Sequence, residues 1–380
     1  MSDSLSSLYG GRGISIASGR GGRIWDSEGR EYVDFFNGHG ASLFGHGNQV
    51  LRRAVYEAAD GVWSSGAGFE SPVREELARL LGSLIGGGMA FICNSGAEAI
   101  EAALKLSVSL RPGRHRILAC RRGFHGRTCG ALALTFNPKY RNPFKRLIPE
   151  VEHFEPDALA QSIDEDTIAV FVEPVQGEGG VYPLSPKTGA AISESCRESG
   201  ALLISDEIQT GLGRCGAVLA SPSAGLDPDI ICLAKGLAGG LPIGAAVWKS
   251  TLGDFPSHGH GSTYGGGEFI ARVAAAALKL ILEGDLSRRA GEIGEELRSG
   301  IEGLGARAIK EIRGMGMLNG IEITSPSVDA VKALQRKGLL SLAAGPRVVR
   351  FLPSFAASPE DISLAVQIIG DVLTRESGAR

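Results

Sequence analysis

Ile204-Ser205-Asp206-Glu207-Ile208-Gln209-Thr210-Gly211 and, further along the chain, Leu233-Ala234-Lys235-Gly236-Leu237 are the segments that decide the fold. Each follows a short apolar run, residues 201–204 and 230–234, and such runs bounded by glycine or proline predict buried strands. Asp206 ends one strand and Lys235 ends the other. Because ligands of parallel α/β sheets bind at the carboxyl ends of the strands, we expect both side chains at one ligand site.

The pairing of an acid with a lysine suggests a particular cofactor chemistry. A lysine amine at a strand end can form a Schiff base with an aldehyde cofactor, and an aspartate can keep a pyridine nitrogen charged. Asp206 and Lys235 therefore indicate an enzyme that uses pyridoxal phosphate.

Composition excludes several other classes of protein. The chain has 380 residues, enough for roughly two domains, and 43% of them are hydrophobic. The net charge of −3 argues against binding nucleic acid mainly by charge, and no apolar run reaches the ~18 residues that a bilayer span needs. Residues 1–9 are polar, with no apolar core of a secretory signal, so we expect a cytoplasmic protein with no membrane partner. The six cysteines are expected to be free thiols.

Strand and helix patterns alternate from about residue 85 to residue 250, which predicts a mostly parallel sheet with helices on both faces. The segment 10–23 is rich in glycine and arginine and could be an RNA-binding segment. Its alternating Ile14 and Ile16, followed by turns and apolar runs up to Phe35, instead favour a small antiparallel β element. From Ala290 onward, a helix, a hairpin and a further helix predict a smaller α+β domain.

Three strand-end motifs add candidate site residues. Asn94-Ser95-Gly96-Ala97-Glu98 joins a strand to a helix, and the free N–H groups of such a turn can bind an anion. Phe124-His125-Gly126-Arg127-Thr128 supplies an aromatic ring and an arginine, which can stack on a flat ring and bind a carboxylate. Glu173-Pro174-Val175-Gln176-Gly177-Glu178 holds two carboxylates. The histidines lack further ligands, so we predict no metal site.

Seven motifs in order resemble the class III aminotransferases, which have the type I pyridoxal-phosphate-dependent transferase fold. The resemblance runs from about Gly22 to Leu373 and also includes Gly261-Ser262-Thr263-Tyr264-Gly265-Gly266 and Val349-Arg350-Phe351-Leu352-Pro353. It implies an α/β large domain with a mostly parallel seven-stranded sheet, residues 49–258. The smaller α+β domain would comprise the N-terminal segment 1–48 and the C-terminal residues 259–380.

The resemblance also implies a role for each matched residue. Lys235 matches the Schiff-base lysine, and Asp206 matches the acid that pairs with the pyridine nitrogen. The other cofactor-binding positions are the phosphate cradle and the residues around the ring, namely Ser95, Gly96, Ala97, Phe124, Gln209 and, reaching in from the partner subunit of a homodimer, Thr263. The implied substrate-binding residues are the arginine for the distal carboxylate, the arginine for the α-carboxylate, the carboxylate gate that pairs with it, and a serine: Arg127, Arg350, Glu178 and Ser262.

Within the class, the chain is most similar to acetylornithine aminotransferases and to their lysine-pathway relatives, through residues 138–144 and 344–350. This similarity implies transfer of the terminal amine of N2-acetyl-L-ornithine to 2-oxoglutarate, in arginine biosynthesis. The alternatives are a carrier-linked aminoadipate semialdehyde, 4-aminobutyrate, ornithine or succinylornithine as substrate, and a non-catalytic cofactor-binding protein. The sequence departs from the family pattern at residues 68–70, 267–269 and 354–355. These departures bear on the specificity for the acyl group of the substrate and not on the cofactor chemistry.

Overall fold

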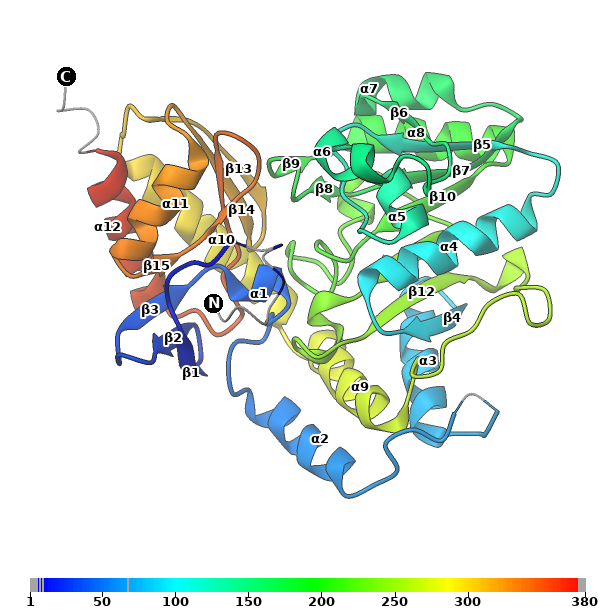
Figure 1. The fold of residues 1–380 in the computed structure, drawn as a ribbon, viewed down its shortest axis with the longest axis horizontal. Helices are drawn as coiled ribbons and strands as arrows, with labels where there is room; N and C mark the ends of the chain where they lie inside the picture. Colours follow the sequence, from blue (N-terminus) through cyan, green and yellow to red (C-terminus); the bar gives the residue numbers. More distant parts are fainter. Residues whose placement is uncertain (1–5, 7, 9, 67, 375–380) are drawn as a thin grey trace.

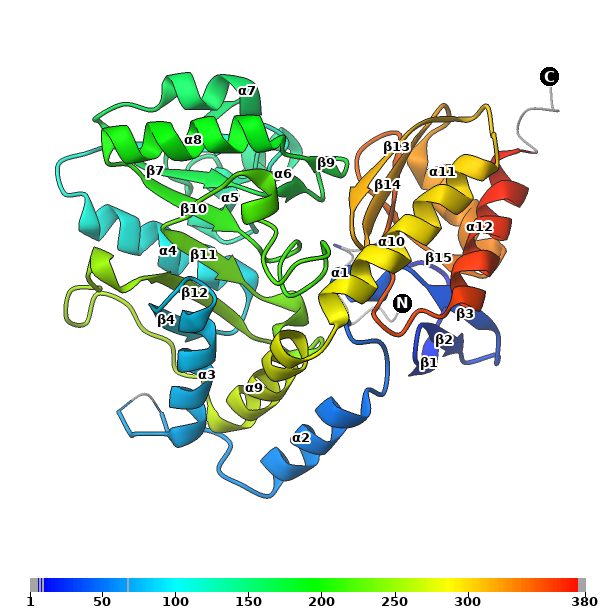
Figure 2. The same cartoon turned by 180° about the vertical axis from the view of Figure 1, so that it is seen from behind.

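The computed structural model describes residues 6, 8, 10–66 and 68–374, so most of the polar segment 1–9 lies outside the described residues. Figures 1 and 2 show two unequal parts side by side, a larger one around a seven-stranded sheet and a smaller one that contains both ends of the described chain. Within the described residues, no helix combines the length and the apolar character needed to cross a bilayer. All six cysteines are free thiols, as expected, and only Cys129 is exposed.

The large sheet confirms the predicted α/β architecture. Six strands run in one direction, and β12 alone is antiparallel to both of its neighbours. In spatial order the strands are β4 (Gly88–Cys93), β12 (Gly244–Lys249), β11 (Ile230–Leu233), β10 (Leu202–Asp206), β7 (Thr167–Val172), β5 (Arg116–Cys120) and β6 (Glu152–Phe154).

Alternating side chains along the strands place apolar groups on both faces of this sheet. Ala119, Phe171 and Ile204 pack with the helix α4 (Gly96–Leu110), whereas Leu118 and Leu203 pack with α8 (Pro186–Ser199). Figures 1 and 2 show α4 and α8 on opposite faces of the sheet. Because both faces are covered, the strands are apolar throughout, and only their ends carry polar side chains.

The remaining helices of the large part complete these layers. Asn48 and Ser71 cap the first turns of α2 and α3 with their side-chain oxygens, as expected for residues that open helices. The helices, short helices and two-stranded ribbon are α1 (Asn37–Gly40), α2 (Gln49–Ala59), α3 (Pro72–Ser83), α5 (Cys129–Leu134), α6 (Pro138–Arg141), η1 (Asn142–Phe144), α7 (Pro156–Leu159), η2 (Ala160–Ser162), β8 (Val175–Gln176), β9 (Tyr182–Pro183), η3 (Pro222–Ala224), η4 (Lys235–Ala238), η5 (Ser250–Leu252) and α9 (Glu268–Glu283).

Two four-stranded sheets form the smaller part. The predicted N-terminal antiparallel element is β1 (Ile16–Arg20), β2 (Arg23–Asp26) and β3 (Glu31–Asp34), and it continues into β15 (Leu339–Leu340). The second sheet orders β13 (Ile309–Met315), β14 (Leu318–Ile323), β17 (Val348–Phe351) and β16 (Leu342–Ala343). The helices are α10 (Leu286–Gly303), α11 (Ser327–Arg336) and α12 (Pro359–Leu373).

The packing of α9 bears on the division that the family resemblance implies at residue 259. The helix α9 packs against α2 and α3 of the large part rather than against the small sheets. We therefore propose that the C-terminal part of the small domain begins near Gly284, between α9 and α10.

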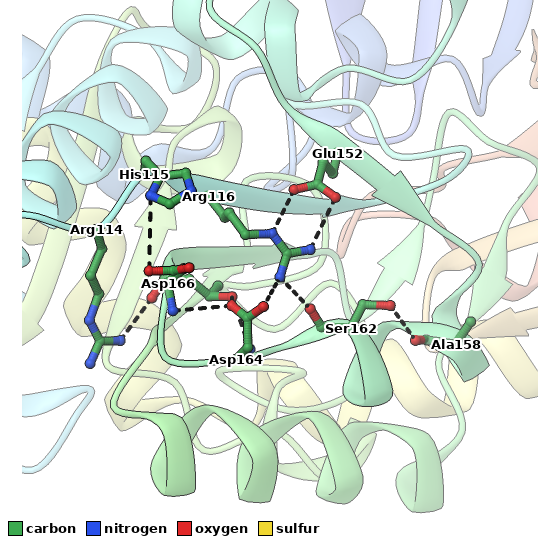
Figure 3. A network of polar contacts seen from close by, with 9 residues as sticks. Arg114, His115, Arg116, Glu152, Ala158, Ser162, Asp164 and Asp166 are labelled. Atoms are coloured by element: carbon green, nitrogen blue, oxygen red, sulfur yellow. Dashed lines mark hydrogen bonds and ion pairs between the residues drawn. The ribbon is translucent and has the colours of Figure 1, made fainter.

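A polar network ties the amino ends of the sheet together, at the edge away from the Asp206 strand end (Figure 3). Arg116, on β5, donates from Nε and Nη2 to the two carboxylate oxygens of Glu152 on β6, at 2.8 and 3.0 Å. Its Nη1 donates to the carbonyl oxygen of Ser162 at 3.0 Å and to Asp164, which precedes β7. One guanidinium therefore connects segments next to three strands.

Replacing Arg116 by methionine should lower the free energy of unfolding by about 1–2 kcal/mol, because the partners are partly exposed and solvent screens their charges. Urea unfolding would measure the change, with Arg116→Lys as the control that keeps the charge but not the paired hydrogen bonds. Activity should not change, since the network lies away from the strand ends that carry Asp206 and Lys235. Equal stabilities of the methionine variant and the parent would contradict this prediction.

Candidate active site

A cavity of about 560 Å³ lies at the carboxyl ends of the central strands, next to β17 of the small part. It brings together residues that lie more than 250 positions apart in the chain. Its polar and aromatic lining includes His39, Asn94, Ser95, Phe124, His125, Arg127, Glu173, Glu178, Asp206, Gln209, Lys235 and Arg350. Eleven of these, all except His39, and the neighbouring Gly96 and Ala97 belong to the motifs singled out in the sequence.

Asp206 ends β10 and is held in a fixed orientation at the bottom of the cavity. One carboxylate oxygen accepts the Ile208 N–H at 3.0 Å, and the other lies 2.8 Å from Nδ1 of His125. Both side chains are buried, at 4% and 0% exposure. Burial lowers the pKa of His125, but the hydrogen bond to Asp206 and its charge outweigh burial and leave the pKa raised. The pair is therefore stabilised as a carboxylate with an imidazolium.

Lys235 lies two residues after β11, the strand next to β10, and is the first residue of η4. Its φ of +42° is a left-handed backbone conformation that is costly for a residue with a side chain and that clusters at functional sites. Burial is the main reason that the pKa of Lys235 falls to about 8, and Arg350 lowers it further against the opposing charge of Asp206. A sizeable fraction of its amine is consequently neutral, and so nucleophilic, near neutral pH.

The N-terminus of α4 forms the wall that could hold an anion. Ser95 caps the helix through its Oγ, which accepts the Glu98 N–H at 3.2 Å. Within the described residues, the N–H groups of Gly96 and Ala97 in the first turn have no hydrogen-bond acceptor, and both residues line this end of the cavity. A Cβ at Gly96 would lie 2.8 Å from the side chain of Ile208, so a larger residue would require the Ile208 side chain or the turn to shift.

Gln209 extends the site toward the N-terminal segment. Its Nε2 is buried without a hydrogen-bond partner among the described residues. Gly40 packs against it with φ of +87°, and a Cβ there would come within 2.3 Å of that nitrogen. The segment around Gly40 therefore closes over Gln209, while Nε2 is left able to donate to a bound group.

Phe124 and the loop before Glu178 are connected by Glu173, a buried residue whose role the sequence alone did not indicate. Its two carboxylate oxygens accept the backbone N–H of Phe124 at 2.9 Å and that of Gly177 at 3.4 Å. Burial raises the pKa of Glu173 to about 7. This carboxyl group thereby fixes an aromatic side chain on one side of the cavity relative to the loop on the other.

Two arginines reach the cavity from different elements. Arg350, on β17, is buried and donates from Nη2 to Glu178 at 2.9 Å, while its Nε has no partner among the described residues. Glu178 is 38% exposed and belongs to a loop, so it can move without disturbing the core. Arg127 is exposed at the cavity wall and has neither an ion pair nor a hydrogen bond from its side chain within the described residues.

Ser262 and Thr263 are predicted site residues that the structure does not place in the cavity of the same chain. The Oγ of Ser262 accepts from Asn94 Nδ2 at 3.1 Å and from the Gly265 N–H at 3.0 Å. Thr263 is exposed on the loop that precedes α9. His39, in contrast, lines the cavity although the sequence analysis did not name it as a site residue. Burial and then Arg350 lower the pKa of His39.

Comparisons with known proteins agree with this geometry. Residues 10–373 match the family described as aminotransferase class-III. The acetylornithine aminotransferase of Bacillus subtilis is 37% identical over 98% of both chains. A transaminase of Sulfolobus acidocaldarius that acts on LysW-aminoadipate semialdehyde and glutamate semialdehyde is 35% identical over 98% of this chain and 97% of its own.

Solved structures extend the similarity to three dimensions. The ornithine aminotransferase of Toxoplasma gondii superimposes with a TM-score of 0.94 at 31% identity, over 99% of this chain and 93% of its own. That structure contains pyridoxal phosphate at partial occupancy in its active site. The N-acetylornithine aminotransferase of Stenotrophomonas maltophilia gives a TM-score of 0.83 at 29% identity, over 98% of both chains.

Proposed function

Because the chain belongs to the class III aminotransferases, we propose that it moves the terminal amine of an N-acyl diamino acid to 2-oxoglutarate. N2-acetyl-L-ornithine is the donor that we favour, with an N-acyl semialdehyde and L-glutamate as products. The observation that carries this proposal is the pair of arginines, Arg127 free at the wall and Arg350 neutralised by Glu178. The two arginines together can bind the two carboxylates of a dicarboxylate. When Glu178 stays on Arg350, Arg127 alone can bind a monocarboxylate.

The cofactor of this family is pyridoxal 5′-phosphate, and the cavity residues fit it. The turn Ser95–Ala97 offers unpaired N–H groups to a phosphate, and Asp206 offers a carboxylate to a ring nitrogen. Gln209 Nε2 can donate to a ring hydroxyl, Phe124 can stack on the ring, and Lys235 can bond to the aldehyde carbon. When bound, the cofactor accepts the donor's amine and holds the electron pair released from the donor carbon.

Each proposed step uses a group that the chain already positions. Once the donor's amine has replaced Lys235 at the aldehyde carbon, the released neutral amine of Lys235 would take the proton from the donor carbon and return it at the cofactor. Asp206, which is held in place by His125, keeps a negative carboxylate at the bottom of the cavity as the proton leaves. Since both substrates use one site in turn, ping-pong kinetics are expected, and a ternary-complex pattern would reject this order.

Glu178 is proposed to select which amine of a substrate reacts. With Glu178 on Arg350, the guanidinium is neutralised, and a donor bound by Arg127 presents its terminal amine. When glutamate binds, its α-carboxylate displaces Glu178 from Arg350 and its γ-carboxylate contacts Arg127. Leaving Arg350 unpaired during the first half-reaction would be costly because its side chain is only 3% exposed.

Replacing Glu178 by alanine should raise the ratio of kcat/KM for glutamate to kcat/KM for N-acetylornithine by about tenfold. The reason is that the α-carboxylate of glutamate would no longer have to displace the Glu178 carboxylate from Arg350. Initial rates with each donor would measure the ratio. Glu178→Gln, which keeps the size and removes the charge, should behave like the alanine variant. An unchanged ratio in both variants would reject the gate.

The lysine-pathway reaction is the second candidate because relatives of both activities are comparably similar over the whole chain. A donor panel with 2-oxoglutarate as acceptor separates the possibilities: N-acetylornithine, ornithine, succinylornithine, 4-aminobutyrate and a carrier-linked aminoadipate donor. We expect the highest kcat/KM with N-acetylornithine. A higher value with any other donor would replace the proposed substrate but keep the transaminase.

A homodimer is proposed as the active form, with Thr263 reaching the partner's cofactor phosphate. Support comes from an exposed apolar surface around the same loop, where Trp63, Phe69 and Tyr264 are 65%, 70% and 71% exposed. Light scattering of the holoenzyme should give twice the chain mass. We also propose a cytoplasmic location, in arginine biosynthesis.

A further inference from the structure

We propose that Tyr140 is a positioning residue for Arg127 and that this aromatic ring sets the strength of carboxylate recognition in the cavity. The inference deepens the proposed function, since it concerns how the free arginine of that site is held. Tyr140 belongs to the family-like segment 138–144, and the family resemblance implies no role for it.

The geometry is that of a guanidinium stacked on a ring. The Arg127 guanidinium carbon lies 3.4 Å from the centroid of Tyr140 and 5.7 Å from that of Phe124. The two rings are 6.3 Å apart and nearly perpendicular, at 84°. An arginine over an aromatic face within about 6 Å is attracted by the ring electrons, so the Tyr140 face is the closer and stronger contact.

Tyr140 acts through Arg127 rather than on a ligand. Arg127 and Phe124 line the cavity, whereas Tyr140 does not, so the ring lies behind the guanidinium. Within the described part of the chain no carboxylate pairs with Arg127, and nothing else in the hydrogen-bond network orients it. A guanidinium carbon 3.4 Å from the ring centroid fits a face-to-face contact. Such a contact would leave the N–H edges open, which is the direction from which a carboxylate binds with two hydrogen bonds.

The ring itself sits on an anchored segment. Asn137 caps the short helix by accepting the Lys139 N–H at 3.0 Å through its side chain, and its backbone oxygen accepts the Tyr140 N–H at 3.0 Å. Just before it, the Phe136 N–H donates to the Gly123 carbonyl at 2.9 Å. The short helix that carries Tyr140 and the Phe124–Arg127 loop are therefore both connected to the turn after β5. The ring and the arginine consequently keep their relative positions.

Phe124 gives this arrangement a consequence for substrate length. The ring proposed to stack on the cofactor contacts both Tyr140 and Arg127, so the three side chains form one unit. The distance between the reacting end of the cavity and the arginine that binds the distal carboxylate is thereby fixed. An arginine released from Tyr140 would sample several rotamers, and carboxylate binding would have to order it.

The test uses glutarate, an unreactive five-carbon dicarboxylate, titrated calorimetrically into the holoenzyme. Tyr140→Leu should weaken glutarate binding about 3- to 30-fold, and Arg127→Ala at least as much. Tyr140→Phe keeps the ring and should stay within about twofold of the parent, because the hydroxyl of Tyr140 has no hydrogen bond within the described residues. In the double variant, Tyr140→Leu should add no loss to that of Arg127→Ala.

Steady-state rates separate positioning from a general structural effect. Tyr140→Leu should raise KM for 2-oxoglutarate with little change in kcat or in cofactor affinity. Glutarate affinity that is unchanged in Tyr140→Leu, equally weakened in Tyr140→Phe, or lowered further in the double variant would overturn the proposal. Tyr140→Met is a second apolar variant, and failure of both apolar variants to fold would show a core residue and also overturn it.

The outcome does not depend on the identity of the amine donor. If glutarate binding follows the Tyr140 series while N-acetylornithine is not a substrate, the positioning role stands and the proposed donor is wrong. If N-acetylornithine is turned over but glutarate affinity is the same in the Tyr140 variants as in the parent, the proposed function stands and this inference is wrong.

Discussion

Replacing Lys235 by alanine should reduce kcat for transamination by about 10⁴-fold or more, because one amine both bonds to the cofactor and moves the proton. Among the residues that line the cavity, Lys235 is the lysine, and burial has already lowered its pKa to about 8. The neutral fraction of the amine grows as the pH rises toward that value. Stopped-flow measurement of each half-reaction would show whether both are lost, as this dual role requires.

A matched control is Lys249→Ala. Lys249 is the last residue of the neighbouring strand β12, but it pairs with Asp227 at 2.9 Å on the surface, so its loss should leave kcat unchanged. Borohydride reduction of the parent holoenzyme followed by peptide mapping should place a pyridoxyl group on Lys235. A pyridoxyl group found elsewhere, or full activity of the alanine variant, would reject Lys235 as the catalytic lysine.

Much of the fold was predictable because both faces of the central sheet are covered. Runs such as 168–172 and 201–204 are apolar at every position, and their bounding turns carry glycine, proline or charged residues. The direction of β12 was not readable from the sequence, since Gly244–Trp248 is equally apolar in either orientation. The sequence also did not predict which domain α9 belongs to, because an amphipathic pattern does not indicate which neighbouring element covers the apolar face of the helix.

The candidate site was predictable where a strand end supplied both the position and the chemistry. Asp206 and Glu207 are adjacent acids, and the structure separates them: Asp206 faces the cavity, while Glu207 is buried against Ser221, whose N–H it accepts at 2.7 Å. The alternation of side chains along a strand predicts this separation but not which of the two acids faces the ligand. Its place as the last residue of the strand, together with the family-like pattern, indicated Asp206.

Residues that act through another residue were harder to find. Glu173 and Tyr140 lie 33 residues apart; Glu173 holds Phe124 in place, and Tyr140 contacts Arg127. Local sequence patterns do not record such contacts, because they depend on how separate loops meet. A buried carboxylate before proline at a strand end was the available signal for Glu173, since a buried charge needs partners.

Replacing Asp206 by asparagine should lower kcat by about two to three orders of magnitude while the fold is retained. Asparagine keeps the size of the side chain and can still accept the Ile208 N–H, but it removes the negative charge beside His125 and at the bottom of the cavity. Without that charge, burial is the largest remaining influence on His125 and outweighs the charge of Glu173, so the pKa of His125 should fall below the ordinary value. The parent's imidazolium would become neutral, so the variant loses a charge pair and not a single charge.

The pH dependence of stability separates this account from a local packing defect. In the parent, the pKa of His125 is raised by folding, so its contribution is fully present below the unfolded value near 6.5 and is lost as pH rises through the folded pKa. The stability difference between the parent and Asp206→Asn should therefore be largest below pH about 6.5 and should shrink at higher pH. Urea unfolding from pH 5.5 to 9 measures it. A difference that is constant across this range would mean that Asp206 stabilises the site by shape rather than through the charge it shares with His125.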